Sequence, residues 1–94
     1  MPRDGTIFDK PYTSRKEYGV PRMPRVTARE VERAIMRDGW RHVGGSGSHR
    51  QYEHRTKTRA VTVAFHGNQI VAPGTLSNIL RQAGLTVSQF SALL

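Results

Sequence analysis

Apolar residues in this 94-residue chain recur with helical spacing in two stretches and alternate with polar residues in the region between them. In the first stretch three apolar side chains share one helical face: Val31, Ala34 and Ile35. Thr27 and Glu30 have the spacing of a capping box, and Gly39 suits the left-handed turn that ends many helices. The pattern therefore predicts a helix from Thr27 to about Asp38.

Short β-prone runs follow Gly39 and predict three strands, over residues 40–43, 49–55 and about 60–66. Because side chains alternate along a strand, Arg50 and Tyr52 face one way and His49 faces the other. If Tyr52 joins the core, His49 points toward water. The third strand would add the apolar residues of its own inner face to that core: Val61, Val63 and Phe65.

A second helix is predicted to begin at Pro73, with Gly74 or Thr75 as its cap, and to end at Gly84. Its buried stripe is formed by Leu76, Ile79, Leu80 and Ala83. A second capping box indicates a last short helix, which starts at residues 86–89. The apolar residues of this helix either complete the core or form a surface for a partner: Val87, Phe90, Leu93 and Leu94.

Residues 1–25 hold four of the five prolines and show no apolar period. This composition predicts an extended or disordered N-terminal arm ahead of a folded domain at residues 26–94. Met23 is an alternative natural start, in which case most of the arm would not be made.

Composition and charge favour a soluble, cytoplasmic nucleic-acid-binding protein. The chain has no cysteine, which excludes disulfides and thiolate metal sites, and no apolar run long enough for a membrane span or a signal peptide. Its net charge is +8, and all but one of its 15 Lys and Arg precede residue 60. A basic region of this kind attracts nucleic acid. Arg29, Arg33 and Arg37 recur at every fourth position of the first helix, and we expect them to contact phosphates.

The stretch from Gly44 to Ser48 contains only glycine and serine, and His49 and Arg50 follow it directly. Glycine-rich backbone disfavours regular structure, so we expect a loop that approaches an anion closely. Histidine transfers protons near neutral pH, and arginine binds phosphate oxygens. The combination predicts chemistry on a phosphodiester, and a plain surface loop is the alternative.

Metal and nucleotide chemistry fit the sequence less well. A metal site built from the four histidines (His42, His49, His54 and His66) is disfavoured, because strand alternation puts His49 and His54 on opposite faces. A P-loop is excluded, because no Lys-Ser or Lys-Thr follows the glycines at the required spacing. We therefore expect no metal and no cofactor. The sequence shows no obvious general acid: His54 and His66 are candidates, a structural role is the alternative for both, and we expect a slow enzyme with a single base.

A series of short motifs extends over about residues 24–94. It consists of D-G-W at 38–40, G-S-H at 47–49, the aromatic Tyr52 with His54, V-T-V at 61–63, P-G-T-L at 73–76 and I-L-R-Q-A-G-L at 79–85. In this order the motifs resemble those of the HicA-like mRNA interferase toxins of bacterial toxin–antitoxin pairs. The arm before Met23 and the Arg at position 50 depart from that pattern.

The resemblance implies an α+β fold like that of double-stranded-RNA-binding domains. Its order is α-β-β-β-α, with a three-stranded antiparallel sheet, helices on one face of the sheet and, here, a short C-terminal helix. The resemblance also implies ribonuclease activity on mRNA, a HicB-like antitoxin partner, and His49 as the catalytic residue. Our leading hypothesis is therefore a metal-independent endoribonuclease.

In the expected reaction, neutral His49 takes the proton from a ribose 2′-OH, which then attacks the adjacent phosphorus. Besides the three arginines of the first helix, the expected RNA contacts are Gly47, Ser48, Arg50 and Lys57. The backbone N–H groups of the glycine loop and the Arg50 side chain would stabilise the charge that develops on the phosphate. A non-catalytic RNA-binding module with the same fold is the alternative. The antitoxin is expected to cover the glycine loop and His49, with added apolar contact from the last helix.

Overall fold

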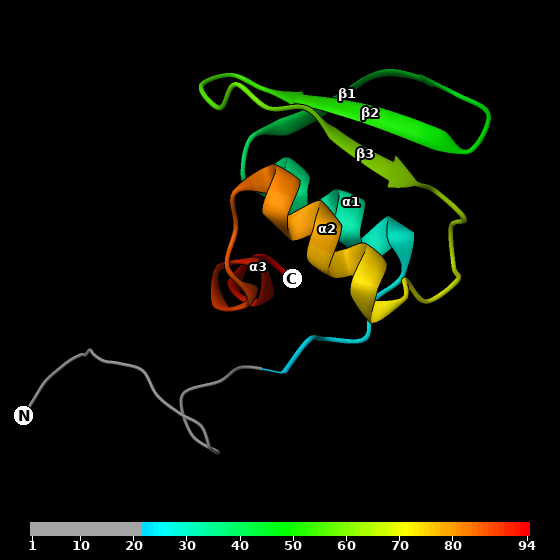
Figure 1. Cartoon of the computed structure of the whole chain (residues 1–94), viewed down its shortest axis with the longest axis vertical. Coiled ribbons are helices and arrows are strands. Elements are labelled where there is room, and N and C mark those ends of the chain that lie inside the picture. Colours follow the sequence, from blue (N-terminus) through cyan, green and yellow to red (C-terminus); the bar gives the residue numbers. More distant parts are fainter. Residues whose placement is uncertain (1–21) are drawn as a thin grey trace, which may run out of the picture.

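The computed structural model describes residues 22–94, in which a three-stranded sheet forms one layer and helices form the other (Figure 1). The elements follow in the order α1 (Ala28–Arg37), β1 (Trp40–Ser46), β2 (His49–His54), β3 (Val61–Ala64), α2 (Pro73–Ala83) and α3 (Val87–Leu93). The sheet is antiparallel, with β2 between β1 and β3. The α+β architecture predicted from the sequence is confirmed.

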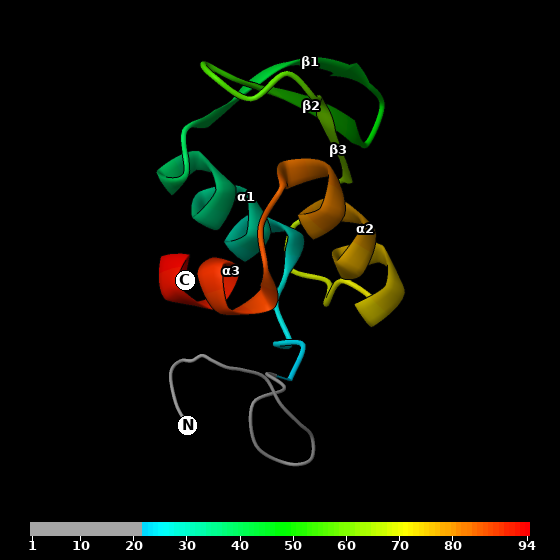
Figure 2. The same ribbon diagram turned by 60° about the vertical axis from the view of Figure 1, so that its left-hand side comes forward.

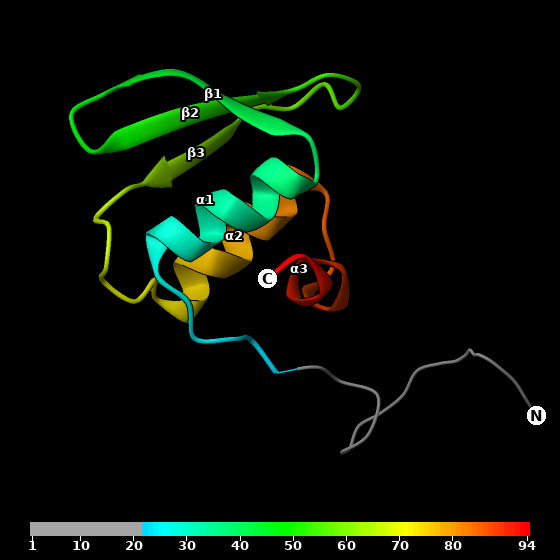
Figure 3. The same ribbon diagram turned by 180° about the vertical axis from the view of Figure 1, so that it is seen from behind.

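The helices cover one face of the sheet. α1 and α2 lie side by side beneath it, and α3 packs against α1 on the side away from the sheet (Figure 2). Seen from behind, the opposite face of the sheet carries none of the elements between residues 22 and 94 (Figure 3). The sheet therefore presents one buried face and one open face.

α1 begins and ends where its local signals predict. The Thr27 hydroxyl accepts a hydrogen bond from the Glu30 backbone N–H at 3.1 Å, and a Glu30 carboxylate oxygen accepts one from the Thr27 N–H at 2.8 Å. These bonds satisfy two backbone donors that the first turn leaves free. At the other end Gly39 adopts a φ of 107°, which favours glycine.

The expectation of a loop over residues 44–48 is wrong. β1 continues to Ser46 and pairs with β2, with a bulge between His42 and Gly44. Only Gly47 and Ser48 form the turn. Glycine weakens a strand that must pack its side chains, but here hydrogen bonds to the neighbouring strand order the backbone.

Gly45 explains why a glycine is needed inside β1. It pairs with Arg50 at a φ of 138°, and a Cβ at this position would lie 2.0 Å from the backbone carbonyl oxygen of His49. The close approach of the two backbones thus requires the absence of a side chain. The glycines belong to the construction of the hairpin that carries His49.

The core lies between the sheet and the helices and contains the residues that periodicity predicted. Tyr52, Val61 and Val63 from the sheet are fully buried against the apolar stripes of α1 and α2. Phe90 of α3 is fully buried as well, so this residue completes the core and offers no partner surface. Its helix begins with the predicted capping box of Thr86 and Gln89.

The start of α2 differs from the prediction. Its N-cap is Ala72 rather than Gly74 or Thr75, and Pro73 occupies the first helical position, where a proline loses no hydrogen bond. Gly84 ends the helix in the left-handed conformation, as predicted. The second and third strands are shorter than expected and end at His54 and Ala64.

Most of the predicted N-terminal arm lies outside the described residues. Residues 22–25 belong to neither a helix nor a strand, and Met23 packs partly buried against the core. Within the part of the chain that the structure describes, no helix has the length and apolar character needed to cross a bilayer.

Candidate active site

His49 is the first residue of β2, and its side chain lies on the open face of the sheet. Tyr52, three residues further along the same strand, is fully buried beneath the opposite face, and His49 itself is exposed. This is the orientation that strand alternation predicted. Its cross-strand partners are the small residues Ser46 on β1 and Ala64 on β3. The imidazole therefore stands clear of its neighbours, where a substrate can reach it.

His66 lies diagonally across the sheet from His49. Because His49 pairs with Ala64, His66 occupies the position two residues beyond the partner, and such diagonal neighbours are separated by about 7–8 Å. The strand pairing continues past Ala64, since the Phe65 N–H donates to the Ser48 carbonyl at 2.6 Å. His66 is exposed. Two accessible imidazoles thus lie at the same edge of the sheet, one at the start of β2 and one two residues beyond its partner Ala64.

The other two histidines are engaged elsewhere. The Nε2 of His54 bonds the Asp38 carbonyl oxygen at 2.6 Å, and its Nδ1 accepts bonds from the backbone N–H groups of Thr56 and Lys57 at 3.1 Å each. Both ring nitrogens are therefore used in holding the β2–β3 loop to the end of α1. His42 lies next to Tyr52, with 5.5 Å between the ring centroids, on the other face of the sheet from His49.

These positions leave no histidine cluster for a metal. Among residues 22–94, no group of three or more potential metal ligands comes together.

Arg50 points away from His49, toward the helices. Its Nη1 donates to a Glu32 carboxylate oxygen at 2.9 Å, and the hydroxyl of Tyr52 donates to the same oxygen. The guanidinium also lies 3.7 Å from the centroid of the Phe65 ring. Arg50 therefore joins the sheet to α1, and the structure does not bring its side chain to the expected phosphate position.

The ionisation of this cluster follows from its contacts. Partial burial alone would raise the pKa of Glu32, but the hydrogen bonds from Tyr52 and Arg50 outweigh it and hold the pKa below its usual value. Burial, together with the bond that it donates to the Glu32 carboxylate, raises the pKa of Tyr52 well above its ordinary value. The bond to Glu32 raises the pKa of Arg50. The three groups thus form a stable ion pair with a neutral phenol.

Arg29, Arg33 and Arg37 form a basic ridge along α1, and all three are exposed. Only one end of this ridge lies near the candidate site. The guanidinium of Arg29 lies 5.6 Å from the Phe65 ring, at the end of the sheet that carries His49, whereas Arg37 donates to the Leu93 carbonyl of α3 at 2.6 Å. Of the three, Arg29 is the one nearest the histidine pair.

Lys57 lies at the other end of the sheet. Its Nζ donates to an Asp38 carboxylate oxygen at 2.7 Å and to the Ala83 carbonyl at 2.8 Å. It therefore joins the β2–β3 loop to the ends of α1 and α2, and the structure does not bring it to His49.

Gly47 and Ser48 form the turn that precedes His49. Gly47 is exposed and has a φ of 60°, and the Ser48 carbonyl is held by the third strand through the bond from Phe65. The turn is therefore anchored on one side and open on the other.

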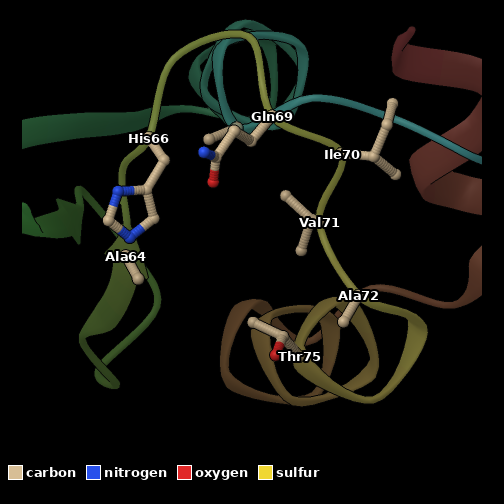
Figure 4. A pocket seen from close by; sticks show the side chains of 8 residues that line it. Ala64, His66, Gln69, Ile70, Val71, Ala72 and Thr75 are labelled. Atoms are coloured by element: carbon tan, nitrogen blue, oxygen red, sulfur yellow. The ribbon is translucent and has the colours of Figure 1, made fainter.

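A cavity of about 140 Å³ adjoins His66 at the outer edge of β3 (Figure 4). Its lining includes Ala64, His66, Gln69, Val71, Ala72 and Thr75. Sequence reasoning did not identify Gln69 or the cavity, because they depend on how the loop after β3 folds over the start of α1. The loop is related to His49 only through Ala64, which pairs with His49 and also lines the cavity.

Comparison with known proteins identifies one family. A family model described as the HicA toxin of bacterial toxin–antitoxin systems matches residues 28–85, which span α1 to the end of α2. No curated protein matches the chain. The resemblance inferred from the ordered motifs is confirmed.

Proposed function

We propose that this chain, which belongs to the HicA toxin family of bacterial toxin–antitoxin pairs, is a metal-independent endoribonuclease that cleaves mRNA. Membership of the family makes the protein the toxin of such a pair and implies an antitoxin partner. The activity on mRNA would place its action in the cytoplasm. The observation that carries the proposal is the pair of exposed imidazoles, His49 and His66, at diagonal positions on the sheet.

The reaction needs a base, an acid and stabilisation of the phosphate. His49, unprotonated, takes the proton from the ribose 2′-OH, and the oxygen attacks the adjacent phosphorus. His66, protonated, gives its proton to the departing 5′-oxygen on the other side of the phosphorus. The products are a 2′,3′-cyclic phosphate and a 5′-hydroxyl. His54 is the weaker candidate for the acid, because both of its ring nitrogens are bonded within the protein.

The charge that develops on the phosphate needs donors close to His49. Backbone N–H groups of the turn at Gly47 and Ser48 remain the nearest candidates. Arg50 is a poorer candidate than its sequence position suggested, because its guanidinium is bonded to Glu32 beneath the sheet. Arg29 approaches the site from α1 and supplies a positive charge without a direct role in proton transfer.

Variants of single histidines test the proposal. The purified full chain, His49→Ala, His66→Gln and the control His42→Gln are incubated with single-stranded RNA in EDTA. We expect the wild type and the control to cut, His49→Ala to be inactive and His66→Gln to be strongly impaired. RNA with a 2′-deoxyribose at the scissile position should resist cutting, because the nucleophile is absent.

A modified substrate separates the roles of the two histidines. When sulfur replaces the 5′-oxygen of the leaving group, departure no longer needs a proton, because thiolates are far weaker bases than alkoxides. Cleavage of this substrate by His66→Gln should recover to nearly the wild-type rate, and His49→Ala should stay inactive. Binding of RNA without His49-dependent cleavage would instead identify a non-catalytic RNA-binding module.

A further inference from the structure

The cavity at the edge of β3 shares a wall with His66, the proposed catalytic acid. Ala64, which lies opposite His49 in the sheet, and His66 line one side of it, and Val71, Ala72 and Thr75 line the other (Figure 4). A group bound there would therefore lie beside His66, on the side away from His49. This position is within one nucleotide of a phosphate held between the two imidazoles.

The volume of the cavity matches a single aromatic ring. It measures about 140 Å³, and an apolar protein cavity of about 150 Å³ is known to accept benzene. A six-membered pyrimidine ring has this size, whereas the two fused rings of a purine exceed it. Size alone thus favours one ring over two.

The lining has the chemistry that a nucleobase requires. Val71 and Ala72 supply apolar surface for the faces of a ring, and the imidazole of His66 is a stacking surface of the kind that RNA-binding proteins use. The carboxamide of Gln69 is directed toward the cavity (Figure 4). A carboxamide offers both a donor and an acceptor, which are the groups that read the Watson–Crick edge of a base.

A positive charge borders the same loop. The guanidinium of Arg29 lies 3.5 Å from the position that a Cβ on Gly67 would occupy, and Gly67 follows His66 directly. An apolar cavity with an amide at its wall and a guanidinium beside the loop that forms that wall suits a base joined to a phosphate. An apolar side chain of a protein partner would leave both the amide and the charge without a use.

We infer that this cavity binds the nucleobase on the 3′ side of the scissile phosphate and favours a pyrimidine there. The 3′ side follows from the assignment of His66 as the acid, because the acid lies next to the departing 5′-oxygen of the 3′ nucleoside. The inference thus rests on the proposed function. It adds a base preference that neither the motifs nor the family match contains.

The test uses oligonucleotides in which a single ribose lies among 2′-deoxyriboses, so that only one bond can be cut. The nucleotide on the 3′ side of that ribose is varied among U, C, A, G and an abasic residue. With the full wild-type chain we expect cleavage before U or C to be at least about tenfold faster than before A, G or the abasic residue. No variant is needed for this measurement, so impaired folding cannot affect it.

Two variants then locate the preference in the cavity. Ala72→Leu fills it from an exposed position that makes no side-chain capping bond, and Gln69→Leu removes the polar groups at similar size. Both variants should bring the ratio of the cleavage rate before pyrimidines to that before purines close to one. Ala92→Leu, the same change at an exposed position of α3, is the control and should keep the wild-type ratio.

The outcomes separate this inference from the proposed function. Equal rates before all five residues, with cleavage still dependent on His49, would overturn the base subsite and leave the ribonuclease intact. An Ala72→Leu variant with wild-type cleavage and base preference but weakened binding to the antitoxin would also overturn it, in favour of a protein-binding cavity. If no His49-dependent cleavage occurs at all, the proposed function fails and the subsite fails with it.

Discussion

His49 and Arg50 are adjacent in the chain, yet their side chains lie on opposite faces of the sheet. His49 is exposed on the open face, and Arg50 reaches down to bond Glu32 of α1 at 2.9 Å. Two residues that looked like parts of one phosphate site therefore have different surroundings. The histidine is free for chemistry, and the arginine joins the layers of the fold.

The Glu32 carboxylate should stabilise the fold in a pH-dependent way. Folding lowers the pKa of Glu32 from its ordinary value of 4.5, so its contribution is fully present above that pH and is lost as the pH falls through the folded-state pKa. Glu32→Gln should cost about 1 kcal/mol at pH 7, since Arg50 is partly exposed and solvent weakens the pair. The difference in the free energy of unfolding between Glu32→Gln and the wild type should become smaller in acid.

Urea unfolding of both proteins at pH 7 and at pH 3 measures this effect. Glu53→Gln is the matched control, because Glu53 is exposed on the open face. A Glu32→Gln variant that is equally destabilised at both pH values would contradict the assignment to the ion pair.

Gly45 should tolerate no side chain, whereas the preceding residue, Gly44, should tolerate one. A Cβ at Gly45 would lie 2.0 Å from the His49 carbonyl oxygen, at a positive φ, whereas a Cβ at Gly44 has no atom within 4 Å. We expect Gly45→Ala to destabilise the protein by roughly 2–4 kcal/mol and to abolish cleavage, because it displaces the start of β2. Gly44→Ala should have a small effect on both.

Thermal unfolding and RNA cleavage, measured on the two alanine variants side by side, check this prediction. Equal behaviour of the pair would mean that the strands need no close approach at Gly45.

Local signals in the sequence predicted the helices well, and they also predicted which side chains of β2 face the core. The capping boxes at Thr27 and Thr86 depend only on residues three positions apart, and both form as predicted. The alternation that buries Tyr52 and exposes His49 depends only on neighbours in one strand. Features of this kind need no knowledge of the rest of the chain.

Features that depend on distant residues were not predictable in the same way. The glycine stretch becomes strand because β2 pairs with it, and the cap of α2 moves to Ala72 because Pro73 fits the first helical position. The partners of Lys57 lie 19 and 26 residues away in the chain. The relation of His49 to His66 appears only once the register of β2 and β3 is known.

Lys57 should contribute to stability more than to RNA binding. Its ammonium bonds both Asp38 and the Ala83 carbonyl, so Lys57→Met should lower the free energy of unfolding by about 1–2 kcal/mol. The dependence of RNA affinity on salt should keep its wild-type slope. Arg59→Met also removes one positive charge, at an exposed position, and is the control for stability.

Denaturant titration and salt-dependent binding together decide the role of Lys57. A stability equal to the wild type, with a slope reduced by about 0.7, would show a phosphate contact instead.

The ridge on α1 should contribute unequally to RNA affinity. Each phosphate contact with single-stranded RNA adds about 0.7 to the slope of log affinity against log salt. Arg29→Gln should flatten the slope by this amount, because Arg29 lies nearest the histidine pair. Arg37→Gln should leave it unchanged, because Arg37 bonds the Leu93 carbonyl.

Binding of a non-cleavable 2′-deoxy-substituted RNA over a range of salt concentrations gives these slopes. If Arg29, Arg33 and Arg37 are all changed to Gln and the slope stays as in the wild type, the ridge is solvated and makes no phosphate contact.

The antitoxin should silence the toxin by covering the β1–β2 hairpin. The exposed arginines Arg41 and Arg55 lie at the end of the hairpin away from His49, and they would attract an acidic HicB-like partner to the hairpin as a whole. Phe90 cannot supply the apolar contact first expected of it, because it is fully buried. Val43, 44% exposed at the bulge of β1, is the apolar side chain that the hairpin offers instead.

Hydrogen exchange with and without the antitoxin tests this occlusion. β1 is an edge strand, so about half of its N–H groups point away from β2, and these groups and the turn at residues 47–48 should exchange fast in the free toxin. They should become protected in the complex, and Val43→Asp should weaken binding without reducing RNA cleavage by the free toxin. If residues 44–52 keep their exchange rates while cleavage is lost, the antitoxin acts from a distant surface and direct occlusion is wrong.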